Sequence, residues 1–168
     1  PPATPGSAAD LAALQRVVPQ PVTVTAYAGT FALTAATTIH ASAGAEAVAT
    51  DLAGYLKQQT GLAVSDDGGA DASIQLVLQA EGGDPAWGAE GYRLTVSTAS
   101  IKVTAASAAG LFHGVPTLRQ LVTADHKIPA GVIDDHPRFG YCGVMQGGAR
   151  PVLCGPGHAG YVRRAVFS

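Results

Sequence analysis

The chain has little charge, few aromatic side chains and no long apolar run. Of its 168 residues, 13% are charged and 6% are aromatic, and the formal net charge is −2. A nearly neutral chain does not attract a polyanion, so we expect no nucleic-acid partner. Threonine, serine and glycine interrupt the apolar stretches, which stay far below the ~20 residues that cross a bilayer. We therefore expect no membrane partner either.

Cysteine and acidic residues are missing from large parts of the chain. The two cysteines, Cys142 and Cys154, both lie near the end, so the body of the chain is built without disulfides and says nothing about redox compartment. Asp135 is the last acidic residue, although the chain continues to Ser168. The composition thus changes near the end of the chain.

The first ten residues read PPATPGSAAD and contain no initiator methionine. Such a start is typical of an exported protein after its signal peptide has been removed, although an arbitrary chain boundary would read the same. We expect residues 1–16 to be a flexible segment and the protein to be secreted.

Apolar periodicity in the first half of the chain predicts a short helix, two strands and a longer helix. The spacing of leucines and valines over 9–18 predicts one or two helical turns. Alternation over 22–33 predicts a strand pair that bends at Gly29. From Ser42 onward the period becomes helical, and Gly61 stands where a helix should stop.

The second half predicts strands around one further helix. Ser107 is a natural N-cap for this helix, and Pro116 inside it predicts a kink or a restart, because proline lacks a backbone donor. The expected strands cover 73–79, a hairpin of 91–97 with 100–105, and 127–135. We predict an α+β fold, a two-layer sandwich with a mostly antiparallel or mixed sheet and two helices on one face.

Three long stretches, at 17–39, 90–122 and 128–145, carry a family resemblance. They include AAGLFHG in the second helix and DDHPRFGY at the exit of the last strand. In sequence and order they resemble the N-terminal, non-catalytic domain of bacterial glycoside hydrolase family 20 β-N-acetylhexosaminidases. The resemblance implies an accessory α/β sandwich domain over 17–136 and the start of a (β/α)8 barrel over 137–145.

The chain departs from the family pattern near this barrel start. Cys142 stands at the position of the arginine that holds sugar hydroxyls in the family, and the pattern is lost after Met145. We expect 146–168 to be an irregular, non-family tail, and our hypothesis is that the chain is truncated or its reading frame is disrupted near Met145. His113 and Pro116 replace a usual tyrosine and glutamine in the second helix.

The resemblance also implies what the parent enzyme does. Family enzymes hydrolyse terminal N-acetylglucosamine or N-acetylgalactosamine from glycans or chitooligosaccharides by a substrate-assisted retaining mechanism with an Asp–Glu pair. No H-x-G-G-D-E-like segment occurs here, so we expect no catalytic or substrate-binding residue and no hydrolase activity of this chain alone. The expected partner is its own barrel, with self-association possible through the barrel-facing surface. The alternative is an independent carbohydrate- or protein-binding module.

Two aspartate pairs and a glycine motif are candidate sites. Adjacent carboxylates at Asp134 and Asp135 should point to opposite faces of a strand, which favours a solvated or capping role over acid–base catalysis. Asp66 and Asp67 precede two glycines and indicate a turn, with a bound cation as the alternative. GPGHAG at 155–160 has the spacing of a nucleotide-binding loop but lacks the following helix and acid.

Sulfur, imidazole and aromatic groups gave two further candidates. A set of four cysteine and histidine residues could supply zinc ligands. It lacks the C-x-x-C or H-x-x-x-H spacing that is typical of zinc sites, so we expect no metal and no cofactor. This set is Cys142, Cys154, His158 and His136. Trp87 could form a sugar-stacking shelf but is better explained as a loop anchor, and Tyr92 is expected in the core or sheet.

Overall fold

The computed structural model describes residues 4–66, 68–69, 71–79 and 87–137, together with the backbone of 143–146 and 150–153. Two compact units, Pro1–His136 and Pro137–Ser168, divide the chain. None of the helices among the described residues has the length and apolarity to span a membrane.

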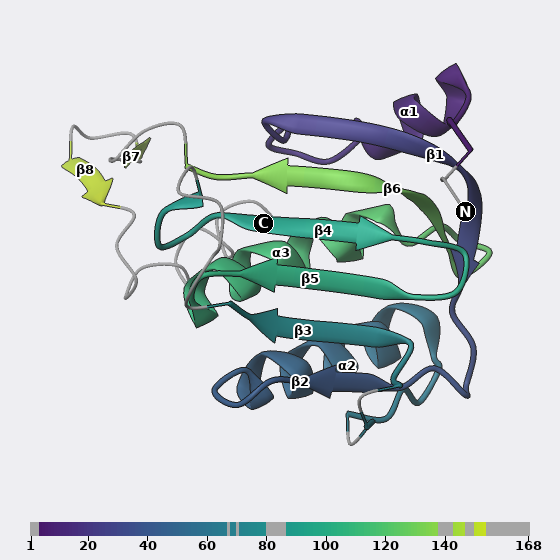
Figure 1. Ribbon diagram of the computed structural model, residues 1–168. Coiled ribbons are helices and arrows are strands. Elements are labelled where there is room, and N and C mark those ends of the chain that lie inside the picture. The colour runs from purple at the N-terminus through teal and green to yellow at the C-terminus, as the bar shows by residue number, and fades with distance from the viewer. Residues whose placement is uncertain are drawn as a thin grey trace. The chain divides into compact units, whose positions relative to one another are not determined.

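The first unit is built on one six-stranded sheet with the order β1-β6-β4-β5-β3-β2 (Figure 1). Its strands are β1 Thr23–Ala32, β2 Ile39–Ala41, β3 Ile74–Leu78, β4 Tyr92–Val96, β5 Ile101–Ala105 and β6 Lys127–Asp135. In this order, β1, β6, β4 and β5 pair antiparallel with one another, whereas β5, β3 and β2 pair in parallel. The sheet is therefore mixed, and the predicted α+β class is confirmed.

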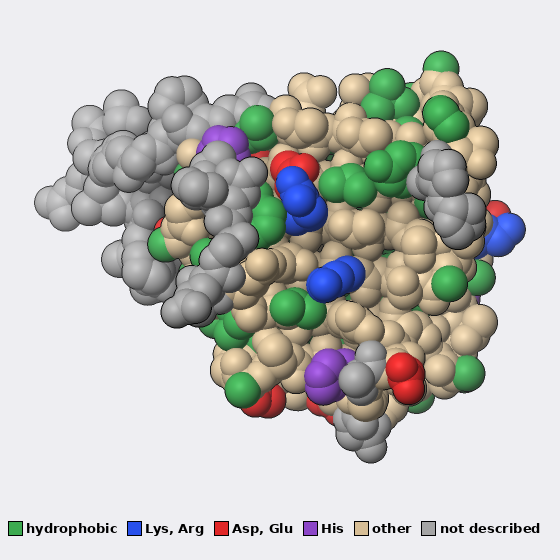
Figure 2. Space-filling model, in the orientation of Figure 1, with side chains coloured by type: hydrophobic (Ala, Val, Ile, Leu, Met, Phe, Trp, Pro, Cys, Tyr) green, Lys and Arg blue, Asp and Glu red, His purple; other side chains and the backbone are tan. Residues whose placement is uncertain are grey.

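The hairpin of β4 and β5 shows how the sheet divides into two faces. Its register runs from Tyr92 opposite Ala105 to Val96 opposite Ile101. Alternate residues are buried beneath the helices, while Arg93 and Lys102 lie exposed on the other face. Figure 2 shows this open face, where hydrophobic side chains are scattered among polar ones. The alternating sequence predicts this arrangement, in which one face of the sheet is buried and the other is exposed to solvent.

Strand β1 corrects the predicted strand pair. It is a single strand, and both of its halves pair with β6, with a register shift between Ala26 and Thr30. Gly29 lies within the shift at φ 106°. Glycine tolerates this left-handed conformation, so the chain bulges and continues along the same neighbour without turning back.

Helix α2, Glu46–Thr60, confirms the predicted first long helix. Gly61 ends it in the left-handed conformation, φ 74°, and donates its backbone N–H to the carbonyl of Lys57. This is the glycine C-cap that the sequence indicates. Val48, Leu52 and other residues of its inner side are buried.

Helix α3, Ala108–Leu121, begins at the expected cap. The Ser107 hydroxyl accepts a hydrogen bond of 3.2 Å from the N–H of Gly110. The restart expected at Pro116 is wrong, because the α-helix continues through it to Leu121. Proline removes one hydrogen bond, to the carbonyl of Phe112, and the buried side of α3 holds the remaining turns together.

Helix α1, Ala8–Leu14, occupies half of the segment predicted to be flexible. Ser7 and Asp10 form a reciprocal capping box, and the hydrogen bonds from Ser7 lower the pKa of the Asp10 carboxyl. Leu14 is fully buried, and an added Cβ at Gly131 in β6 would collide with its side chain. The missing side chain at Gly131 thus makes room for α1 to pack on the sheet.

Both edges of the sheet are covered by neighbouring segments. On β1, Gly6 donates to the carbonyl of Ala26 at 3.0 Å. On β2, a strand that the sequence analysis did not predict, Ile39 donates to the carbonyl of Ser65 at 2.7 Å. Covered edges resist pairing with other chains.

The second unit contains a two-stranded antiparallel sheet of β7, Gly143–Gln146, and β8, Arg150–Leu153. Strand β7 overlaps the expected start of the barrel, 137–145, and extends one residue beyond it, and β8 falls in the expected non-family tail. Cys142, Cys154, His158 and the GPGHAG motif lie outside the described residues.

Candidate functional site around helix α3

Helix α3 lies over the centre of the sheet and touches β3, β4, β5 and β6. Two glycines let it approach closely. A Cβ at Gly110 would lie 2.8 Å from the Cβ of Ala105 and still closer to the carbonyl oxygen of Gly91, and a Cβ at Gly114 would lie 2.8 Å from Val103 Cγ1. Its AAGLFHG segment therefore provides a flat surface for the sheet.

A buried polar cluster ties α3 to the sheet. The Tyr92 hydroxyl lies 2.5 Å from the Thr117 hydroxyl, and Tyr92 is 3% exposed. Burial is the main cause that raises the pKa of Tyr92 to about 12; the Thr117 hydrogen bond lowers it, and the Asp135 carboxylate raises it further. The expectation that Tyr92 is a core or sheet residue is confirmed.

Asp135 links this cluster to the start of the sheet. Its carboxylate accepts a hydrogen bond of 3.2 Å from the N–H of Val22, just before β1. Tyr92 and Asp135 face each other in the β4–β6 register. The cluster therefore joins α3, β4, β6 and the entry to β1 where β6 ends.

Asp134 lies on the opposite face and pairs with Arg93. The guanidinium donates to the two carboxylate oxygens of Asp134 at 2.6 and 3.2 Å. The same guanidinium lies 5.4 Å from the centroid of the Trp87 ring, which is 5% exposed. The prediction that the two aspartates point to opposite faces is confirmed, and Trp87 is a packed ring within this group. The Arg93 pair is half exposed, so its contribution to stability is small.

The outer side of α3 carries a second group of contacts. The Arg119 guanidinium stacks on the Tyr55 ring of α2 at 4.3 Å, and the Gln59 amide donates to the Arg119 carbonyl at 3.1 Å. The Nε atom of Arg119 is buried and, within the described part of the chain, has no hydrogen-bond partner. A buried donor without an acceptor is costly, so this atom is unusual.

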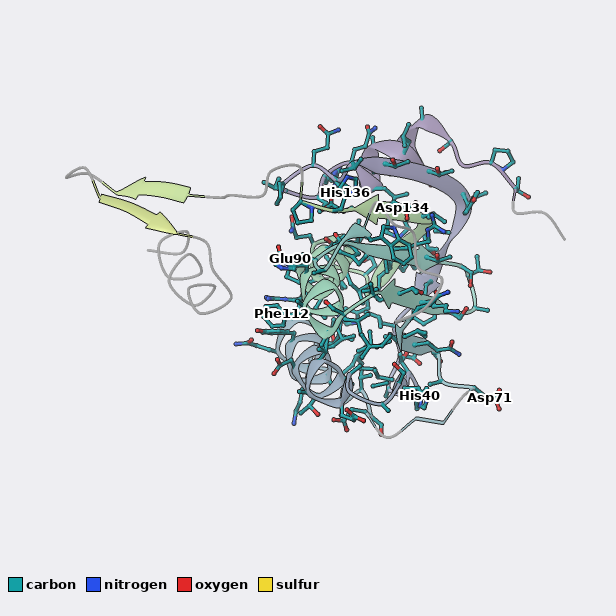
Figure 3. All side chains as sticks on the ribbon, turned by 60° about the vertical axis from the view of Figure 1, so that its left-hand side comes forward. His40, Asp71, Glu90, Phe112, Asp134 and His136 are labelled. Atoms are coloured by element: carbon teal, nitrogen blue, oxygen red, sulfur yellow. The ribbon has the colours of Figure 1, made fainter. Side chains whose placement is uncertain are left out.

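The ends of α3 also contact segments from elsewhere in the chain. Gln120 accepts from the backbone N–H of Val18 at 2.9 Å and donates to its carbonyl at 3.1 Å. At the other end, His113 Nε2 lies 3.8 Å from a carboxylate oxygen of Glu90, both half exposed. Figure 3 shows Phe112 and Glu90 on the same side of the first unit, away from the labelled His40 and Asp71.

The predicted turn at Asp66 has a structural role. The Thr50 hydroxyl of α2 donates to its carboxylate at 2.9 Å, and His40 Nδ1 lies 2.8 Å from the carbonyl of Gly68. Asp67 lies outside the described residues. No three histidine, cysteine, aspartate or glutamate side chains gather as metal ligands within the described ranges. Arg119 was missed from sequence, because its surroundings depend on how α2 packs beside α3.

The sequence matches "Glycosyl hydrolase family 20, domain 2" over residues 14–136. A beta-N-acetylhexosaminidase of Cellulomonas fimi is 36% identical over 138 residues, which cover 76% of this chain and 27% of that protein.

Solved structures of larger enzymes share the fold. The N-acetyl-beta-hexosaminidase of Streptomyces plicatus has a TM-score of 0.65 and 35% identity, covering 83% of this chain and 28% of that one. The beta-N-acetylhexosaminidase of Streptomyces coelicolor has a TM-score of 0.65 and 33% identity, covering 82% and 28%. This chain thus spans little more than a quarter of these relatives. Because the family match covers most of its length, the chain belongs to glycosyl hydrolase family 20, of which it contains domain 2.

Proposed function

We propose that residues 14–136 act as the accessory domain of a β-N-acetylhexosaminidase and brace its catalytic (β/α)8 barrel. The observation that carries this proposal is the domain 2 match over these residues, together with a chain that spans only 28% of the Streptomyces plicatus enzyme. The parent enzyme would remove terminal N-acetylhexosamine from glycans or chitooligosaccharides by the substrate-assisted retaining mechanism.

The arrangement of acids in the first unit supports a structural role. Asp134 is paired with Arg93 on the open face, and Asp135 is bonded to the backbone of Val22 on the other. A pair of carboxyl groups that catalyses glycoside cleavage has to reach one bound substrate together. These adjacent aspartates cannot do so, because each belongs to a different face of the sheet.

Trp87 does not favour the alternative of a carbohydrate-binding module. A stacking shelf needs an exposed aromatic face, whereas the Trp87 ring is 5% exposed and lies beneath the Arg93 guanidinium. Its environment is that of a packed anchor.

A chimera tests the bracing role. The segment of the Streptomyces plicatus enzyme that corresponds to residues 14–136 is replaced by these residues, and turnover of a chromogenic N-acetylglucosaminide is measured. We expect activity within about threefold of the parent, because a correct scaffold leaves the barrel geometry unchanged. The 168-residue chain alone should show no turnover, and isothermal titration with N-acetylglucosamine oligomers should show no heat.

Three outcomes contradict the proposal. A chimera that is inactive or unfolded would show that these residues do not support a barrel. Heat on titration would identify a carbohydrate-binding module, and turnover by the chain alone would identify a self-sufficient enzyme. For the isolated 168-residue chain we also propose that the barrel-facing surface promotes self-association, which sedimentation at increasing protein concentration would measure.

A further inference from the structure

We propose that Arg119 is the polar anchor of the domain interface and that it receives a carboxylate side chain from the catalytic domain. This inference rests on the proposed bracing role and adds to it a named residue, a face of the domain and the chemistry of the partner group. The occupant of this face is the catalytic domain of the same polypeptide.

First, Arg119 has a hydrogen-bond donor that is left without a partner. Its Nε atom is buried and has no acceptor among the described residues, while the residue as a whole stays partly exposed. Tyr55 covers one face of the guanidinium at 4.3 Å, which holds the planar group in place. A guanidinium that is fixed and partly stripped of water is a strong donor to a carboxylate, since its fork matches two oxygens.

The second argument is the apolar surface beside it. The side chain of Val18 is 75% exposed. Val22 is the only other exposed large hydrophobic residue among those that the structure describes. Gln120, the neighbour of Arg119, holds both backbone groups of Val18. The last turn of α3 therefore fixes an exposed valine through Gln120, the residue that follows Arg119, and exposed apolar groups and arginine are both suited to an interface that excludes water.

The third argument is charge complementarity. Helix α3, Ala108–Leu121, contains no aspartate, glutamate or lysine, and Arg119 is its single arginine. Helix α2, by contrast, carries acids and a lysine on its exposed side. Glu90, at the far end of α3, lies beside His113. Among the described residues no carboxylate forms an ion pair with Arg119, which leaves its charge available to a carboxylate on a covering surface.

The source of that surface follows from the relatives. The matched part makes up 28% of the Streptomyces plicatus chain, so most of that polypeptide lies outside this domain and is available to cover it. A second copy of this chain is the competing occupant, and the experiment distinguishes the two.

Arg119→Gln is introduced both into the chimera and into the 168-residue chain, and thermal unfolding is followed in each. The variant keeps a polar side chain but loses the charge. We expect the melting temperature of the chimera to fall by about 2 to 4 °C, since one charged partner of a buried pair is removed, with less than about 1 °C of change in the isolated chain. Lys57→Gln, which removes an exposed cation of α2, is the matched control and should leave both unchanged.

The outcomes separate the two proposals. An equal fall in both backgrounds would show that Arg119 acts only within the domain, through Tyr55, and would overturn the inference; so would no fall in either. Loss of a dimer of the 168-residue chain on Arg119→Gln, seen by sedimentation, together with an unchanged melting temperature of the chimera, would identify a second copy as the occupant and also overturn it. An inactive or unfolded chimera that retains Arg119 would overturn the bracing role and the inference with it.

Discussion

Helices α2 and α3 cover the same face of the sheet, but α2 buries Val48, Ala49, Leu52 and Leu56 out of 15 residues, whereas α3 buries half of its 14. The buried residues of α3 are Gly110, Leu111, Gly114, Val115, Thr117, Leu118 and Leu121. Helix α2 lies over the edge strand β2, while α3 lies over four central strands.

The exposed sides of the two helices differ as well. Helix α2 presents Glu46, Asp51 and Lys57 to solvent, as is typical of a surface helix. Helix α3 exposes Ala108, Ala109, His113 and Gln120, none of them an acid, a lysine or an arginine, and its Arg119 is only partly exposed. The comparison teaches that α2 is a charged surface helix at the edge of the sheet, whereas α3 is a weakly charged helix packed over the centre of the sheet.

The largest expected effect tests the close approach of α3. In Gly110→Ala the new Cβ would lie 2.8 Å from Ala105 Cβ and closer to a backbone oxygen of Gly91, so the backbone has to shift. We expect a loss of about 3 kcal/mol in the free energy of unfolding, measured with urea. The control is Gly54→Ala in α2, where no heavy atom lies within 4 Å of the added Cβ. This variant should gain about 0.5 to 1 kcal/mol; similar effects at both glycines would remove the distinction between the helices.

A smaller effect of opposite sign is expected at Pro116. Pro116→Ala restores the backbone donor for the carbonyl of Phe112 and removes the ring clash, at an unchanged helix length. We expect the free energy of unfolding to rise by about 2 kcal/mol, part of the gain being offset because the unfolded chain becomes more flexible. Gln58→Ala on the exposed side of α2 is the control and should change stability by only a few tenths. A loss of stability at Pro116→Ala would show that the proline ring packs productively.

The smallest of the three effects concerns the tie between α3 and the sheet. Tyr92→Phe removes the hydrogen bond to Thr117 and should cost about 1 kcal/mol at pH 7. Burial, opposed by the Thr117 hydrogen bond and aided by Asp135, raises the pKa of Tyr92 to about 12, above its ordinary value of 10.0. The unfolded protein therefore loses this proton first, and the stability present below pH 10 is lost as the pH rises towards 12.

Melting temperatures from pH 8 to 12 measure this loss. The wild-type protein should lose stability more steeply above pH 10 than Tyr92→Phe, which has no hydroxyl to ionise there. Tyr27→Phe, at a half-buried position of β1, is the control for loss of a tyrosine elsewhere in the sheet. Parallel curves for wild type and Tyr92→Phe would contradict the assignment of the alkaline loss to Tyr92.

Much of the fold could be predicted because its signals are local. The C-cap of α2 at Gly61 and the N-cap of α3 at Ser107 depend on residues within one turn, and both predictions are confirmed. The hairpin of β4 and β5 follows from alternation across a short link. The same local rules predicted a strand pair that bends at Gly29 and a kink or restart at Pro116. The packing of distant segments keeps β1 a single strand and lets α3 continue through Pro116 without a restart.

The sequence by itself determined the class of fold, the positions of most helices and strands, and the family to which the chain belongs, because periodicity, caps and long collinear motifs are contained in neighbouring residues. Only the tertiary structure decided which groups meet. Asp134 pairs with Arg93, Asp135 comes next to Tyr92, and Arg119 stacks on Tyr55. These contacts join residues far apart in the chain, so they depend on strand order and helix packing, which no local pattern encodes.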